Sequence, residues 1–238
     1  QAVLDRYRKG TTVEQNHEAI AILKKLEIRL RMGFISFDYH TSFSELRRNV
    51  AHLRRVVSEN AQLVTQPIFF QNMMSPLEDT PLGREYEARG VSGVPWNARS
   101  LLSEQQRRLV RGGAVVRFSD PRIAFLCEVA RILGSEILQR STVLENRLSD
   151  LFSLRVTPSG AEHDDHLANA LSWFNHLTAF SVDQFGEIVT EVEQAQSLDP
   201  RLLLSLHERI TDRCDEFDTR HYRELLRGPR SVQTDNFC

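Results

Sequence analysis

The 238-residue sequence contains little cysteine, glycine or proline, and it has no long hydrophobic run. Its three cysteines are too few and odd in number for a disulfide framework, and they favour a reducing intracellular compartment, either cytoplasm or nucleus. Eleven glycines and eight prolines exclude collagen-like and low-complexity architectures. No apolar stretch approaches the roughly 20 residues that a membrane-spanning helix requires. The chain begins at Gln1 rather than at methionine, which is typical of a fragment or a processed chain.

Lysine is also scarce, because only Lys9, Lys24 and Lys25 occur among 30 basic residues. This bias is either compositional or functional, since the planar guanidinium of arginine binds phosphate and carboxylate groups well. Residues 1–119 carry 18 basic and 12 acidic side chains, whereas residues 120–238 carry 12 basic and 20 acidic ones. A chain with a basic first half and an acidic second half can pair its own halves, or pair head to tail with a neighbour.

Apolar residues recur at three- and four-residue steps along most of the chain, which predicts helices. Thr12 with Gln15 and Ser42 with Glu45 form two candidate capping boxes, and Asp-Pro pairs at 120–121 and 199–200 are typical helix starts. We therefore expect helices over about 12–32, from 42 to before 67, over 121–155, from 164 or 165 onward, and over 200–226. The glycines at 134 and 186 are the places where the longer helices would bend or break.

The expected architecture is all-α, an antiparallel helical bundle of five to seven helices, of which two or three are long. A single helical domain is expected over residues 1–229, and residues 230–238 are expected to be a disordered tail. Residues 65–100 are expected to be irregular, because they hold half of the prolines. This segment also contains apolar side chains, such as Phe70 and Trp96, that must pack on the core or on a partner.

One apolar stripe in the helix expected over 121–155 repeats every seven residues. Its members are Ile123, Ala130, Ile137, Leu144 and Leu151. An unbroken helix over this range is about 50 Å long, which is longer than a compact monomer of this size needs. The stripe therefore predicts self-association, as a homodimer or larger homo-oligomer, through this helix.

Arginines form a second pattern on the helix expected to start at 42. At 100° per residue, four of them lie together on the flank of the exposed face, away from the apolar stripe. These are Arg47, Arg48, Arg54 and Arg55, and the surface is extended by Arg107, Arg108 and Arg111. Such a surface binds phosphate groups or an acidic protein partner, a second copy included. Few aromatic residues interleave with these arginines, so stacking on single-stranded nucleic acid lacks support, and an ordinary solvated helix face is the alternative.

The densest polar cluster is Glu162–His166, and it contains two imidazoles and three carboxylates. Within it, His163, Asp164 and His166 could hold a divalent metal that activates water, provided that further ligands come from elsewhere. Capping of a helix N-terminus explains Asp164 and Asp165 equally well.

Motifs of known catalytic classes are missing. The sequence has no glycine-rich phosphate loop, nucleophile elbow, paired-cysteine redox motif or zinc-protease motif. Cys127 and Cys214 lie within apolar stripes, which indicates buried structural thiols. We therefore expect a non-enzymatic helical interaction or scaffold protein that needs no cofactor, self-associates and binds an acidic or other protein partner. The alternatives are an arginine-rich phosphate- or nucleic-acid-binding protein, viral or pathogen-encoded in origin, and a metal-dependent hydrolase at Glu162–His166.

Overall fold

A computed structural model describes residues 1–26, 28, 33–60, 70, 81–89, 118–154 and 161–226. Within these ranges the protein is all-α, as predicted, and no β-strand is present. Its helices are α1 (Ala2–Arg6), α2 (Val13–Lys25), α3 (Phe43–Glu59), α4 (Pro81–Ala88), α6 (Pro121–Leu154), α7 (Ala161–Gln194) and α8 (Pro200–Leu226). None of the helices in the described ranges is both long and apolar enough to cross a membrane.

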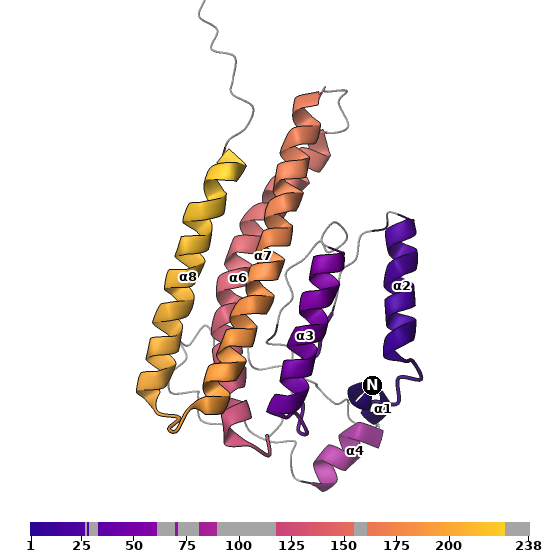
Figure 1. The fold of residues 1–238 in the computed structure, drawn as a ribbon, viewed down its shortest axis with the longest axis vertical. Helices are drawn as coiled ribbons and strands as arrows, with labels where there is room; N and C mark the ends of the chain where they lie inside the picture. The colour runs from indigo at the N-terminus through magenta and orange to yellow at the C-terminus, as the bar shows by residue number, and fades with distance from the viewer. Residues whose placement is uncertain are drawn as a thin grey trace, which may run out of the picture.

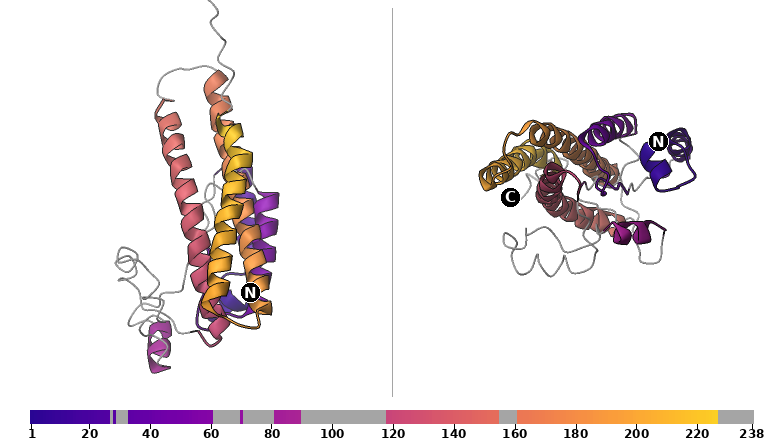
Figure 2. Two further views of the ribbon diagram at one scale, coloured as in Figure 1. Left: turned by 90° about the vertical axis from the view of Figure 1, so that its left-hand side faces the viewer. Right: turned by 90° about the horizontal axis from the view of Figure 1, so that it is seen from below.

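Helix α7 is the centre of the fold, because α3, α6 and α8 all pack against it (Figure 1). Helices α3, α6 and α8 run opposite to α7, so the four form the predicted antiparallel bundle. Helix α6 also packs against α8 on the far side from α3. The short helices α1, α2 and α4 lie outside this bundle, beside or below α3 (Figures 1 and 2).

The helix starts follow from local capping. Thr12 forms the complete capping box with Gln15, whose backbone N–H donates to the threonine hydroxyl at 3.1 Å. The carboxylate of Asp120 accepts from the backbone N–H of Arg122 at 2.9 Å, and Asp199 does the same for the first turn of α8. In both places proline occupies the first helical position, where the missing N–H costs nothing. The predicted starts of α2, α6 and α8 are therefore confirmed.

The core is a continuous apolar cluster that joins α3, α6, α7 and α8. Phe70 contributes to it from outside the long helices, because its ring stacks on Phe185 with centroids 4.1 Å apart. This places Phe70 on the core of its own chain, one of the two outcomes expected for that segment. Trp96, like most of residues 65–100, lies outside the described residues.

Three expectations about helix extents are wrong, namely the end of α2, the start of α7 and the irregular structure expected where α4 forms. Helix α2 ends at Lys25 instead of near 32, because the backbone of Leu26 (φ −89°, ψ 2°) departs from helical geometry. Helix α7 begins at Ala161, earlier than 164, and it continues unbroken through Gly186. Helix α6 passes Gly134 without a break, and its range confirms the helix predicted over 121–155. Part of the segment expected to be irregular, Pro81–Ala88, is helix α4, which starts with proline at its first position.

Helix α4 is attached to the fold through one buried aromatic side chain. Tyr86 is fully buried, and its ring meets Tyr39 edge-on with centroids 6.2 Å apart. The Tyr86 hydroxyl also accepts a hydrogen bond from the backbone N–H of Tyr39 at 3.4 Å. The expected tail at 230–238 lies outside the described residues.

Candidate functional site

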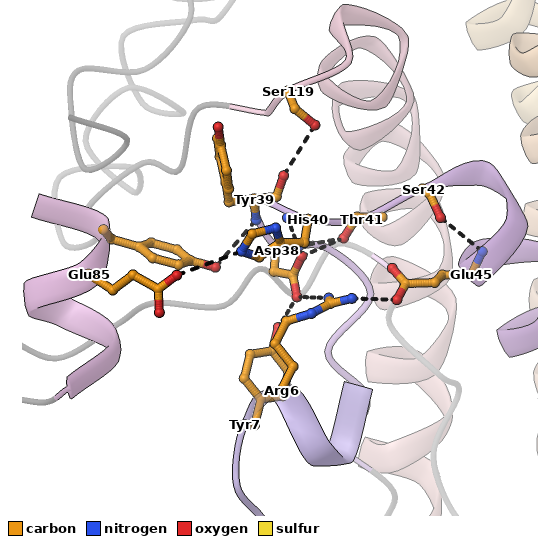
Figure 3. A network of polar contacts seen from close by, with 11 residues as sticks. Arg6, Tyr7, Asp38, Tyr39, His40, Thr41, Ser42, Glu45, Glu85 and Ser119 are labelled. Carbon is orange, nitrogen blue, oxygen red and sulfur yellow. Dashed lines mark hydrogen bonds and ion pairs between the residues drawn. The ribbon is translucent and has the colours of Figure 1, made fainter. Parts of the chain in front are cut away.

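The most buried polar cluster in the described residues surrounds Asp38, between α1 and the start of α3 (Figure 3). Residues 38–41 form a turn in which the Asp38 carboxylate accepts from the backbone N–H of His40 at 2.6 Å and from the Thr41 hydroxyl at 3.2 Å. The same carboxylate accepts from the Arg6 guanidinium at 2.7 Å and from the Tyr7 hydroxyl. Its side chain is only 3% exposed, so α1 is held to the bundle through a buried carboxylate.

Arg6 bridges two carboxylates. A second nitrogen of its guanidinium donates to Glu45 at 2.5 Å, and the Glu45 side chain is 11% exposed. Burial acts to lower the pKa of Arg6, but the hydrogen bonds and charges of Asp38 and Glu45 outweigh it and raise that pKa. Glu45 thus serves Arg6 rather than the predicted capping box, of which only the half donated by its backbone N–H to Ser42 forms.

The network is saturated and therefore acts as an anchor rather than as a proton-transfer site. Burial, followed by the hydrogen bond to Asp38, raises the pKa of Tyr7, so its hydroxyl stays a donor. Every hydrogen-bonding direction of the Asp38 carboxylate is taken by the four donors described above. The adjacent cavity, lined by Val3 and Ile35 among others, measures about 10 Å³, which is room for about one water molecule. A substrate of several heavy atoms does not fit there.

Two of the predicted arginines on α3 join it to α7. Arg47 pairs with Glu193, and Arg54 pairs with Asp183 at 2.7 Å. Close approach of the two helices requires glycine at 186, because a Cβ atom there would lie 2.9 Å from a methyl group of Val50 and 2.9 Å from the Arg54 guanidinium. The charges of Arg47 and Arg54 are therefore engaged within the protein.

The other two arginines point away from α7. Within the described residues the Arg48 guanidinium donates to the Ser44 hydroxyl at 3.1 Å, and that of Arg55 lies 2.5 Å from a ring nitrogen of His17 on α2. Neither forms an ion pair with an acidic side chain in the described ranges. Around them α3 exposes a stripe that we call the α3 crest: Ser44, Arg48, Ala51, Arg55 and Ser58. Of the further predicted arginines, Arg107, Arg108 and Arg111 lie outside the described residues.

Helix α2 lies beside α3 and runs parallel to it. The rings of His17 and His52 meet with centroids 5.1 Å apart. About two turns further along α2, the Lys24 ammonium donates to the Glu59 carbonyl at 2.7 Å. Both contacts join residues 35 positions apart, which fixes the parallel alignment. No side chain of α2 is buried, although the helix is fully formed and capped.

The face of α2 that points away from α3 carries a short apolar stripe, which follows the exposed Gln15 of the first turn. At 100° per residue, Ala19, Ile22 and Leu26 share this face, opposite to His17 and Lys24. We call these three residues the α2 outer stripe. Ile22 is 58% exposed and Leu26 60% exposed, the highest values among large apolar residues in this part of the fold.

The predicted self-association stripe begins inside the protein's own core. Ile123, Ala130 and Ile137 are at most 1% exposed and belong to the cluster between α6, α7 and α8. These three side chains are therefore not available to another molecule. Leu144 and Leu151 lie in the last third of α6, and their side chains are outside the described set.

The predicted metal cluster falls at the first turns of α7. His163, Asp164 and His166 belong to this helix, but their side chains are outside the described set. Among the side chains that are described, no three His, Cys, Asp or Glu residues are placed to hold a metal ion. A site at Glu162–His166 stays a prediction.

The two described cysteines are buried, as predicted. Cys127 is 2% exposed and Cys214 is fully buried. Burial raises the pKa of both thiols, that of Cys214 to about 12. Because the thiolate is the reactive form, neither is suited to nucleophilic chemistry near neutral pH.

No family model matches this chain, and no curated protein or solved structure is significantly similar to it.

Proposed function

We propose that the protein is a non-enzymatic helical interaction protein that binds an acidic protein partner and further copies of itself. The observation that carries the proposal is the α3 crest, on which Arg48 and Arg55 are exposed and have no acidic partner among the described residues. Two other arginines of the same helix are neutralised by α7. The crest therefore keeps two positive charges that no acidic side chain of the described residues neutralises.

The crest suits a helix or extended segment of another protein. Arg48 and Arg55 are seven residues apart, or about 10 Å along the helix, and both point the same way. The residues around them are Ser44, Ala51 and Ser58, whose small side chains let a partner backbone approach closely. A partner with carboxylates at a similar spacing can form two charge-assisted pairs of the kind that arginine favours.

Nucleic acid is the weaker candidate for the same surface. The α3 crest contains no aromatic side chain on which a base can stack. Two arginines also make few phosphate contacts compared with the several that give useful affinity at physiological salt.

The proposal is tested by affinity capture from the native source, with quantification of every captured protein. We expect the wild type to retain an acidic protein that the Arg48→Glu/Arg55→Glu variant loses, with capture unchanged by nuclease treatment. The matched control is Arg213→Glu/Arg220→Glu, which reverses two exposed arginines at the same seven-residue spacing on α8. Equal capture by the wild type and the α3 variant contradicts the proposal, and so does capture that nuclease abolishes.

A further inference from the structure

The α2 outer stripe exposes apolar side chains to solvent on a helix of which no side chain is buried. Among the described residues, helix α2 stands at the edge of the fold, with α3 on one side and no other described helix on the opposite side (Figures 1 and 2). Its inner side is only half-buried, and its outer side presents Ile22 and Leu26 to solvent. Removing such side chains from water is favourable by about 25 cal/mol per Å² of apolar area, so the stripe favours a contact.

Charges beside the stripe identify the occupant. Glu18 and Lys25 lie on one flank of it, seven residues apart, and neither forms an ion pair or hydrogen bond within the described residues. Their midpoint along the helix falls next to Ile22. When two copies of α2 meet antiparallel about a twofold axis at that midpoint, each flank faces the same flank of the other copy. Glu18 of each copy then opposes Lys25 of the other, and the two Ile22 side chains meet beside the axis.

We propose that the protein forms a homodimer through antiparallel contact of its α2 outer stripes, with two symmetric Glu18–Lys25 pairs. A twofold contact of this kind requires a self-complementary surface, and the stripe is one in both polarity and charge. A purely acidic partner is disfavoured at this place, because one carboxylate and one ammonium flank the stripe. This inference rests on the proposed function as an interaction protein, but it uses α2 residues that are separate from the α3 crest.

The dimer is expected to be weak. Helix α2 has 13 residues and is therefore about 20 Å long, so one helix pair buries less than the roughly 800 Å² per partner of a standard interface. We expect a dissociation constant on the order of 10–100 μM. Each surface charge pair contributes little binding free energy. A change that makes both symmetric pairs repulsive should therefore weaken the dimer about tenfold.

The test is sedimentation equilibrium of the full chain at increasing concentration. We expect wild-type dimerisation that Ile22→Ser abolishes, without a change in thermal midpoint, since Ile22 is 58% exposed. Glu18→Lys alone and Lys25→Glu alone each place like charges opposite each other, and each should weaken the dimer about tenfold. The double variant Glu18→Lys/Lys25→Glu should restore wild-type affinity.

Mixing the two single variants gives the sharpest result. In a heterodimer of Glu18→Lys with Lys25→Glu, both pairs are attractive again, so the mixture should associate about as tightly as the wild type. A wild type that stays monomeric at about 500 μM overturns the inference. A dimer that is insensitive to Ile22→Ser overturns it too, and so does a mixture that associates no more tightly than its components. Arg48→Glu/Arg55→Glu should leave the dimer intact, so failure here and failure of the α3 crest to bind a partner are separate outcomes.

Discussion

Replacement of Arg6 by methionine is the most direct test of the buried network around Asp38. The change keeps the aliphatic stem but removes ion pairs of 2.7 and 2.5 Å, leaving two carboxylates whose side chains are 3% and 11% exposed. Breaking a buried ion pair on one side costs about 3–5 kcal/mol. The low end applies, because Arg6 itself is 23% exposed and Asp38 keeps its bonds from Tyr7, His40 and Thr41. We therefore expect a loss of about 3 kcal/mol in the attachment of α1.

Amide hydrogen exchange locates that loss. Exchange in residues 1–12 should accelerate by up to about a hundredfold, while α6, α7 and α8 keep their protection, because the network holds α1 and not the bundle. The matched control is Arg8→Met, which removes an exposed arginine of the same segment.

Two results would refute this reasoning. Equal exchange in Arg6→Met and Arg8→Met would mean that the Asp38 network contributes no more than a solvated surface pair. Faster exchange that extends equally to α6, α7 and α8 would mean that the network does not act on α1 alone.

Three further predictions concern the bundle. Gly186→Leu should lower the free energy of unfolding in urea by about 2 kcal/mol, because its side chain has no space beside Val50. Burial, and then the positive charges of His17 and Arg55, lower the pKa of His52. The unfolded chain then takes up the proton first, so stability should be highest above about pH 6.5 and fall below it, and His52→Leu should flatten that profile in urea titrations at several pH values. The thiols of Cys127 and Cys214 should react with a thiol reagent at pH 8 only after unfolding.

The controls use exposed neighbours of the same type. Glu187→Leu should leave stability almost unchanged, and a cost equal to that of Gly186→Leu would argue against the close approach of α3 and α7. His207→Leu, at an exposed site on α8, should keep the pH profile that His52→Leu loses. Thiol labelling is done in Cys238→Ser, and rapid labelling of that folded variant would contradict burial of the remaining two thiols.

Local signals predicted the starts of the long helices well. The Asp-Pro pairs at 120–121 and 199–200 determine α6 and α8, because a capping carboxylate and a proline act within one turn. The end of α2 at Lys25 has no local signal, because apolar residues continue to recur beyond it and no glycine or proline follows before Gly33. Helix α4 could not be predicted in this way, because the proline and glycine content of 65–100 favours irregular structure.

The candidate site could be predicted only in part. Helical geometry placed Arg48 and Arg55 on an exposed face, but the division of the α3 arginines into paired and unpaired ones depends on where α7 lies. Asp38 was missed for the same reason, because its partners Arg6 and Tyr7 are more than thirty positions away in the sequence. A hydrogen-bonded Asp-x-x-Thr turn at 38–41 is the one local sign of it.

The parallel alignment of α2 and α3 has a consequence for the order of folding. Neighbouring helices that point the same way cannot be closed by a tight hairpin, so the contact between His17 and His52 forms only after the intervening chain has returned to Ser42. Such a crossover costs more loop entropy than the antiparallel neighbours α7 and α8 require, with only five residues between them. We expect the C-terminal hairpin to assemble first and α2 to dock last, which makes α2 the earliest element to detach when the protein is stressed.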